Sequence, residues 1–166
     1  MQIGKAVTAA MNAQIQKELE SAYLYLGMSA YFSGTNHPGA ASWMRIQARE
    51  EVLHAMKFAD FVEDRGGTVV YQAMGAPPAT FTSPLAAFEA AAKHEAKVSA
   101  SINRLYELSA KEKDYAAQAL LQWFITEQVE EEKTSRQIVD TLRQIGSNSS
   151  GLFMFDRELG RRGQAG

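Results

Sequence analysis

Four long amphipathic segments, each with a glutamate in the middle of its apolar face, constrain the fold of this chain more than any other feature. Apolar residues recur with the period of an α-helix over about residues 5–33, 38–65, 84–111 and 114–146. Pro38 and Pro84 suit the first turn of a helix, and Gly146 suits a helix end. The sequence therefore predicts an all-α fold.

The connection between the second and third segments predicts the topology. A second helix of about 27 residues is about 40 Å long, and the roughly sixteen residues of the stretch 67–82 reach at most about 50–55 Å when extended. The stretch can therefore run the length of a bundle. The other connections are short, so we expect a four-helix bundle with antiparallel hairpins, one long crossover and a short C-terminal helix over about residues 149–160.

Length and composition limit the protein class. We expect a single domain over residues 1–166, with the bundle at about 5–146 and a frayed tail from Gly160. The 17 basic and 19 acidic residues leave no positive surplus for nucleic acid. The N-terminus lacks a signal-peptide pattern and no run reaches the roughly 20 apolar residues of a membrane span. We therefore expect a soluble cytoplasmic protein without nucleic-acid or membrane partners.

The inward glutamates indicate metal binding. They lie near the four helix midpoints, and so at one height in the bundle: Glu18, Glu51, Glu95 and Glu131. A single helical glutamate is usually solvated, but four at one level are not independent surface residues. Burying one carboxylate in a dry interior costs on the order of 20 kcal/mol, and no Lys or Arg occupies the centre of these faces. Two divalent cations would balance the four charges, which predicts a dinuclear site.

His54 sharpens this prediction, because Glu51 and His54 lie on one side of a helix and can reach the same ion. The alternative for His54 is a core histidine bonded to a neighbour. The chain has no cysteine, which excludes a thiolate site, and carboxylate with imidazole favours iron or manganese over a closed zinc site. Tyr25 and Trp123 lie near these faces as redox or hydrogen-bonding groups, or simply as packing residues.

The chain resembles the bacterial non-haem ferritins over essentially its whole length. The resemblance rests on four motifs: Lys17-Glu18-Leu19-Glu20, Arg49-Glu50-Glu51-Val52-Leu53-His54, Glu95, and Glu127-Gln128-Val129-Glu130-Glu131. It implies one iron held by Glu18, Glu51 and His54, and a second, bridged by Glu51, held by Glu95 and Glu131. It further implies a third iron site at Glu50, Glu127 and Glu130, sharing Glu131. Gln128 then lies near the second iron and Tyr25 beside the centre.

Departures narrow the choice within this superfamily. The fourth segment reads Glu127-Gln128-Val129-Glu130, so the second Glu-x-x-His motif of bacterioferritins and many di-iron oxygenases is absent. Val52 stands where bacterioferritin has its haem methionine, so no haem is expected. Gln118 and Leu121 replace the acids that line the iron-entry pore of animal ferritins, so the resemblance does not assign the route by which iron enters.

The short C-terminal segment carries five large apolar residues: Leu152, Phe153, Met154, Phe155 and Leu159. They either fold back onto their own bundle or, as the resemblance implies, form a symmetry interface of a 24-subunit shell. The resemblance implies an iron-storage ferroxidase that oxidises Fe(II) with O2 or H2O2. The alternatives are a di-iron oxidoreductase that stores no iron and a metal-free structural bundle.

Overall fold

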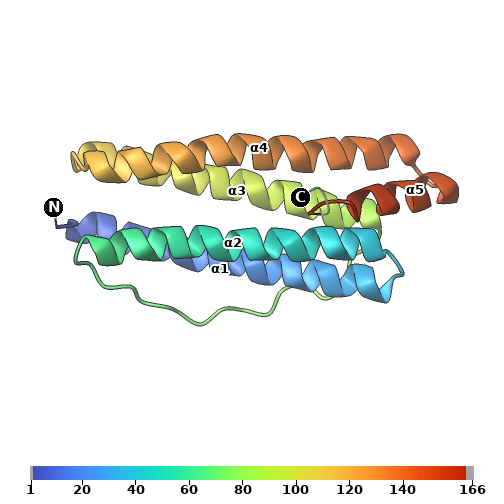
Figure 1. The fold of residues 1–166 in the computed structure, drawn as a ribbon, viewed down its shortest axis with the longest axis horizontal. Helices are drawn as coiled ribbons and strands as arrows, with labels where there is room; N and C mark the ends of the chain where they lie inside the picture. The colour runs from blue at the N-terminus through green and yellow to red at the C-terminus, as the bar shows by residue number, and fades with distance from the viewer. Residues whose placement is uncertain (1, 164–166) are drawn as a thin grey trace.

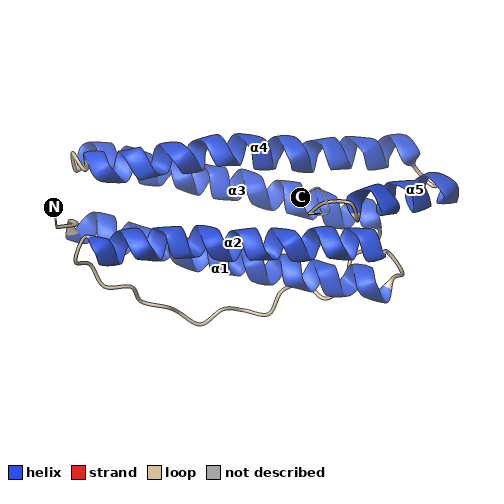
Figure 2. Cartoon of the chain, viewed as in Figure 1, coloured by secondary structure: helices blue, strands red, loops and turns tan. Residues whose placement is uncertain are grey.

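The computed structural model describes residues 2–163, and this part of the chain forms five α-helices connected by loops (Figures 1 and 2). The helices are α1 (Lys5–Gly34), α2 (Pro38–Asp64), α3 (Pro84–Lys111), α4 (Tyr115–Ile145) and α5 (Ser149–Leu159). No strand occurs between residues 2 and 163, so the predicted all-α fold is confirmed. None of these helices is long and apolar enough to cross a membrane.

The long connection between α2 and α3 runs along the outside of α1 for much of the bundle length, so that α2 and α3 are parallel (Figure 1). Side chains of α1 hold it in place: Asn12 donates to the Thr68 carbonyl at 2.9 Å and accepts from the Val70 amide at 2.7 Å. Further along, Pro77 packs against Gly27, where a Cβ would lie 2.9 Å from the proline ring. The predicted crossover is confirmed.

Polar caps begin the helices of the second hairpin. Ser83 accepts a hydrogen bond from the Ala86 amide, and Asp114 accepts one from the Ala117 amide, both at 3.0 Å. Asp114 also receives both hydrogen bonds of an Arg65 nitrogen, at 2.7 and 2.8 Å. This ion pair joins the end of α2 to the start of α4, and so holds the two hairpins in register.

The apolar core is divided into two clusters. One includes Phe32, Trp43 and Phe88, and the other includes Met11 and Phe58. Buried polar side chains are clustered among the same helices: Gln14, Glu18, Gln47, Glu51, His54, Glu95, Gln128 and Glu131. The packing of two apolar clusters therefore holds a layer of acids inside the bundle.

Helix α5 docks on the start of α2 at a point where two backbones nearly touch. A Cβ on Gly39 would lie 1.7 Å from the Asp156 carbonyl oxygen, so only glycine fits there. The Asp156 carboxylate accepts hydrogen bonds from the amides of Gly39 and Ala40, at 2.9 and 2.8 Å. These amides begin a helix, and a carboxylate is favoured at that positive end.

The apolar residues of α5 divide between two environments. Leu159 is buried, and Leu152 and Phe155 pack against the cluster around Trp43. Phe153 and Met154 point away and are 63% and 64% exposed. Only part of the α5 apolar surface is therefore covered by its own subunit.

Arg162, in the tail that is expected to fray beyond Gly160, contacts α2. It forms an ion pair with Glu50, and its guanidinium carbon lies over the Trp43 ring, 4.4 Å from the centroid. A charged contact and an aromatic contact thus connect this part of the tail to the bundle. The last three residues of the expected tail, 164–166, lie outside the described residues.

Candidate metal centre

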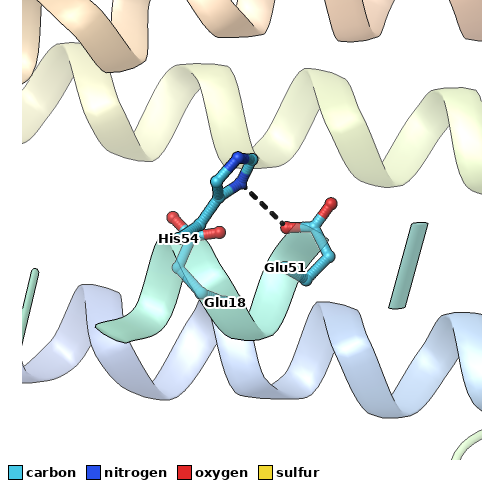
Figure 3. A group of neighbouring side chains, drawn as sticks. All are labelled: Glu18, Glu51 and His54. Carbon is cyan, nitrogen blue, oxygen red and sulfur yellow. Dashed lines mark ion pairs between the residues drawn. The ribbon is translucent and has the colours of Figure 1, made fainter. Parts of the chain in front are cut away.

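Glu18, Glu51 and His54 form a compact group of three potential metal ligands (Figure 3). Glu18 comes from α1, and the other two come from successive turns of α2. One ligand atom of each lies within 4.8 Å of those of the other two. His54 Nδ1 is 3.5 Å from a Glu51 oxygen, as the dashed line in Figure 3 marks. All three residues are buried, so a single ion can contact all of them in a site shielded from solvent.

Glu95 and Glu131 complete the buried layer from α3 and α4. The Tyr25 hydroxyl donates a short hydrogen bond to Glu95, and Gln128 donates to the other Glu95 oxygen at 3.3 Å. The charge of Glu51 raises the pKa of both Glu95 and Glu131, so Glu51 is close to these two acids as well as to its group with Glu18 and His54. The structure thus brings all four sequence-predicted glutamates together, with Tyr25 and Gln128 in contact with one of them.

Burial determines the protonation of these acids when no cation is present. Burial and, second to it, the charge of Glu51 together raise the pKa of Glu18 and of Glu95 to about 8. Burial also raises the pKa of Glu131 to about 7, against a hydrogen bond from Gln47 that lowers it. The metal-free layer therefore holds protons at neutral pH, and an arriving cation would exchange with them.

His54 carries a proton in the same metal-free state. Burial is the largest single influence on it and favours the neutral ring, but hydrogen bonding to Glu51 and the charges of Glu51 and Glu18 together raise the His54 pKa to about 9. The ring is held edge-on against Trp123 and Phe124, with centroid distances of 5.6 and 5.7 Å. Metal binding through this imidazole requires loss of the proton.

The structure adds two buried glutamines that sequence reasoning missed. Gln14 donates to Glu18 at 2.8 Å, and Gln47 donates to Glu51 at 3.0 Å. Each glutamine precedes its glutamate by four residues, a spacing that places both side chains on one helix face. A search for this spacing on the inner faces would have found both of them in the sequence.

A chain of hydrogen bonds leads from Gln14 towards the surface. The Ser101 hydroxyl of α3 donates to the side-chain oxygen of Gln14 at 2.6 Å and accepts from the Lys17 ammonium at 2.5 Å. Gln14 is thereby oriented with its amide nitrogen towards Glu18. No local sequence pattern joins Ser101 to Lys17, because the contact depends on how α1 packs against α3.

The centre has free acceptor capacity of the kind that a cation uses. Oε2 of Glu18 and Oε1 of Gln47 are buried and have no hydrogen-bond partner among the described residues. A buried polar atom without a partner is costly, whereas a carboxylate oxygen facing a cation is satisfied. The oxygen-rich donor set with one imidazole therefore fits iron or manganese ions.

The structure does not gather the residues of the expected third site into a comparable group. Within residues 2–163, the only cluster of three metal-ligating side chains is the one in Figure 3. Glu50 is paired with Arg162, and Glu130 lies on the exposed side of α4, 3.5 Å from Lys133. Glu127 is half-buried.

Comparison with known proteins identifies the family of this bundle. A Ferritin family model, described as a ferritin-like domain, matches residues 8–145, which is most of the chain. The chain belongs to the ferritin family. This membership supports iron storage as the general role of a chain whose inner layer is built from four acids and a histidine.

Relatives and solved structures agree with that assignment. A bacterial non-heme ferritin of Bacteroides fragilis is 39% identical over 96% of this chain and 99% of its own length. A bacterial non-heme ferritin of Staphylococcus epidermidis is 35% identical over 96% of each chain. Among solved structures, an open-pore ferritin from the archaeon Archaeoglobus fulgidus has a TM-score of 0.96 and 45% identity, covering 97% of this chain and 99% of that one. The resemblance to ferritins seen in the sequence motifs is confirmed.

Proposed function

We propose that this ferritin-family chain oxidises Fe(II) at a dinuclear centre and stores the resulting Fe(III) as mineral inside a protein shell. The observation that carries the proposal is the layer of four buried carboxylates with His54 and without a balancing lysine or arginine at its centre. Iron is the substrate here. One Fe(II) binds Glu18, Glu51 and His54, and a second binds Glu51, Glu95 and Glu131.

The surrounding residues prepare the centre for its substrate. Gln14 and Gln47 orient two of the carboxylates, while Tyr25 and Gln128 orient Glu95. Each Fe(II) gives up one electron, and the pair reduces H2O2 with two protons to water, or O2 with two protons to H2O2. The protons that His54 and the acids release on metal binding are a local supply for that reduction.

The proposal includes a third iron position at Glu50, Glu127 and Glu130, which shares Glu131 with the dinuclear centre. Glu50 acts electrostatically on Glu131, so this position adjoins the dinuclear centre. Partly exposed and exposed acids that are not gathered into a tight group suit an ion in transit rather than a permanently held one. Fe(III) would leave the centre through it.

We also propose that the chain assembles into a homo-oligomeric shell of 24 subunits in the cytoplasm. Phe153 and Met154 of α5 support assembly, because two adjacent large apolar residues are left exposed while the rest of the helix is anchored. Most other exposed apolar side chains lie on the bundle itself, among them Leu53 and Val129. An interface between copies would cover such positions.

The test is aerobic loading of purified protein with Fe(II), combined with measurement of particle size. Storage predicts a very large particle that retains more iron than its binding sites can hold. Iron uptake that stops at the number of binding sites, on a small oligomer, would instead favour a di-iron oxidoreductase.

Glu51→Ala tests the assigned centre, because Glu51 is the only ligand shared by both iron positions. We expect the initial rate of Fe(II) oxidation to fall by at least the roughly 10–100-fold typical of losing a supporting residue at a metal site. Glu63→Ala removes an exposed glutamate from the same helix and is the matched control. Equal rates in the two variants would show that the centre lies elsewhere.

A further inference from the structure

The guanidinium of Arg162 lies against the acidic edge of the metal centre, which is the side formed by Glu50 and Glu131. One of its nitrogens pairs with the Glu50 carboxylate, and its central carbon lies over the Trp43 ring, 4.4 Å from the centroid. The Arg162 side chain is 25% exposed, whereas that of the neighbouring Arg161 is 69% exposed and pairs with Glu158 on the surface. Of these two adjacent arginines, the chain directs only Arg162 towards Glu50.

The placement of Arg162 follows from how α5 is anchored. Asp156 binds the first amides of α2, and the contact between Gly39 and the α5 backbone fixes the distance between the two helices. Leu159 is buried one turn later. Three residues beyond that anchor, Arg162 reaches Glu50 in the fourth turn of α2, so its position is built into the packing of α5.

Arg162 acts on the inner layer as well as on Glu50. Burial raises the pKa of Glu131 to about 7, and the positive charge of Arg162 acts in the opposite direction. Nη1 of Arg162 is buried and has no hydrogen-bond partner in the described part of the chain. A buried donor without an acceptor is unfavourable as a purely structural contact, and it leaves the charge of the group as its main interaction with the acids.

We propose that Arg162 is a tethered cation that occupies the acidic edge between Glu50 and Glu131, and that a metal ion binding there must displace it. The inference rests on the proposed function, because it concerns the third iron position. A guanidinium supplies one positive charge and a divalent ion supplies two, and two cations at the same carboxylate repel each other. Arg162 therefore lowers the affinity of this position for metal.

The displaced side chain has a place to go. Beside Arg162 lies a cavity of about 400 Å³ between α4 and α5, lined in part by Trp43, Thr134, Gln137 and Glu158. Glu158, which pairs with Arg161 at 2.7 Å, offers a second carboxylate for a guanidinium in the lining of this cavity. Movement of Arg162 from Glu50 towards Glu158 would change the contact between the guanidinium and Trp43 and leave the Glu50 carboxylate free.

The test compares Arg162→Gln with Arg161→Gln, which removes the same charge from the adjacent residue without touching Glu50. Zn²⁺ is the probe, because it is redox-inert and reports binding without iron oxidation. By titration calorimetry we expect the weakest class of Zn²⁺ sites to bind about five- to tenfold more tightly in Arg162→Gln, as for loss of a partly buried ion pair. Arg161→Gln should match the parent protein.

Two further measurements make the result specific. Adding Glu50→Gln to Arg162→Gln should abolish the gain, because the metal then loses its ligand. In a Trp123→Phe background, Zn²⁺ should change the Trp43 fluorescence of the parent protein at the concentration that fills the weak site, and this change should vanish in Arg162→Gln.

Equal Zn²⁺ affinities in Arg162→Gln and Arg161→Gln, or no weak class of sites in either, would overturn the inference. That outcome is separate from the fate of the proposed function, which depends on Fe(II) oxidation and iron storage. A parent protein that fails to oxidise Fe(II) but whose weak Zn²⁺ site responds to Arg162→Gln would refute the ferroxidase activity and retain the role of Arg162.

Discussion

At the scale of single residues, the metal centre is held in shape by neutral amides and a serine. Gln14 donates to Glu18, and Gln47 donates to Glu51 and also hydrogen-bonds Glu131, which leaves Oε2 of Glu18 free for a cation. Ser101 fixes the orientation of Gln14, and Lys17 fixes Ser101. A positive charge is thereby linked to Glu18 through two neutral groups, at a distance that leaves the cation position open.

Replacing Ser101 tests this support. In Ser101→Ala, Gln14 loses its hydrogen-bond donor and can rotate away from Glu18, so we expect metal affinity at the Glu18 position to fall about tenfold. The measurement is anaerobic Fe(II) titration. Ser109→Ala is the matched control, because Ser109 is a buried serine of the same helix whose hydroxyl donates to the Leu105 carbonyl, away from the metal centre. Identical titrations of the two variants would exclude a role for Ser101.

At the scale of elements, a few atoms at the junction between α2 and α5 determine where α5 packs on the bundle. Gly39 permits the approach, and the Asp156 carboxylate satisfies two amides at the start of α2. Residues after α5 inherit their position from this junction. The packing of α5 thus determines the position of Arg162, which lies next to the metal centre.

Gly39→Ala should separate α5 from α2. The added Cβ would meet the Asp156 carbonyl at 1.7 Å, and since backbone cannot yield cheaply, we expect a loss of about 1–3 kcal/mol in unfolding free energy. The measurement is chemical denaturation of the metal-free protein, with Trp43 fluorescence as the local report. Gly34→Ala is the control, because nothing lies within 4 Å of its added Cβ. If both variants were as stable as the parent, the junction would not hold α5.

At the scale of the whole molecule, the bundle combines two apolar clusters with a layer of buried acids that is stable only when protonated or metal-bound. The free energy of burying charge is on the order of several kcal/mol per ion even after relaxation. The fold stabilises the layer through its apolar ends, and a bound cation then removes the remaining electrostatic cost.

This arrangement predicts an unusual pH dependence of stability. The folded pKa values of Glu18, Glu95, Glu131 and His54 are about 8, 8, 7 and 9, all above their ordinary values of 4.5 and 6.5. The folded state therefore binds more protons than the unfolded state, so these groups stabilise fully below about pH 4.5 and their contribution is lost as pH rises to about 9.

We expect the Tm of the metal-free protein to fall from pH 5 to pH 9. Saturating Zn²⁺ should reverse this slope, because the metal replaces the protons and binds more tightly as they leave. Thermal melts at several pH values provide the measurement, and Glu95→Gln, which removes one titrating group, should flatten the metal-free slope. A Tm that rises with pH in metal-free protein would contradict the assigned protonation.

Much of the fold was predictable because its signals are local. Helical periodicity, the prolines at positions 38 and 84 and the length of the 67–82 stretch predict five helices and a crossover, and each of these depends on residues close in sequence. The common height of Glu18 and the other three inward glutamates in the bundle also follows from their spacing along the helices. By contrast, the contacts of Arg162 were missed, since they depend on Glu50 and Trp43 far earlier in the chain.

The sequence by itself determined a helical bundle with four acids and His54 at one height, because helix geometry converts spacing into position. Tertiary structure alone decided which groups accompany those acids. Lys17 and Ser101 are 84 residues apart, and Glu50 and Arg162 are 112 residues apart. Contacts over such separations depend on how helices pack and where α5 is anchored, and periodicity within a helix contains no record of either.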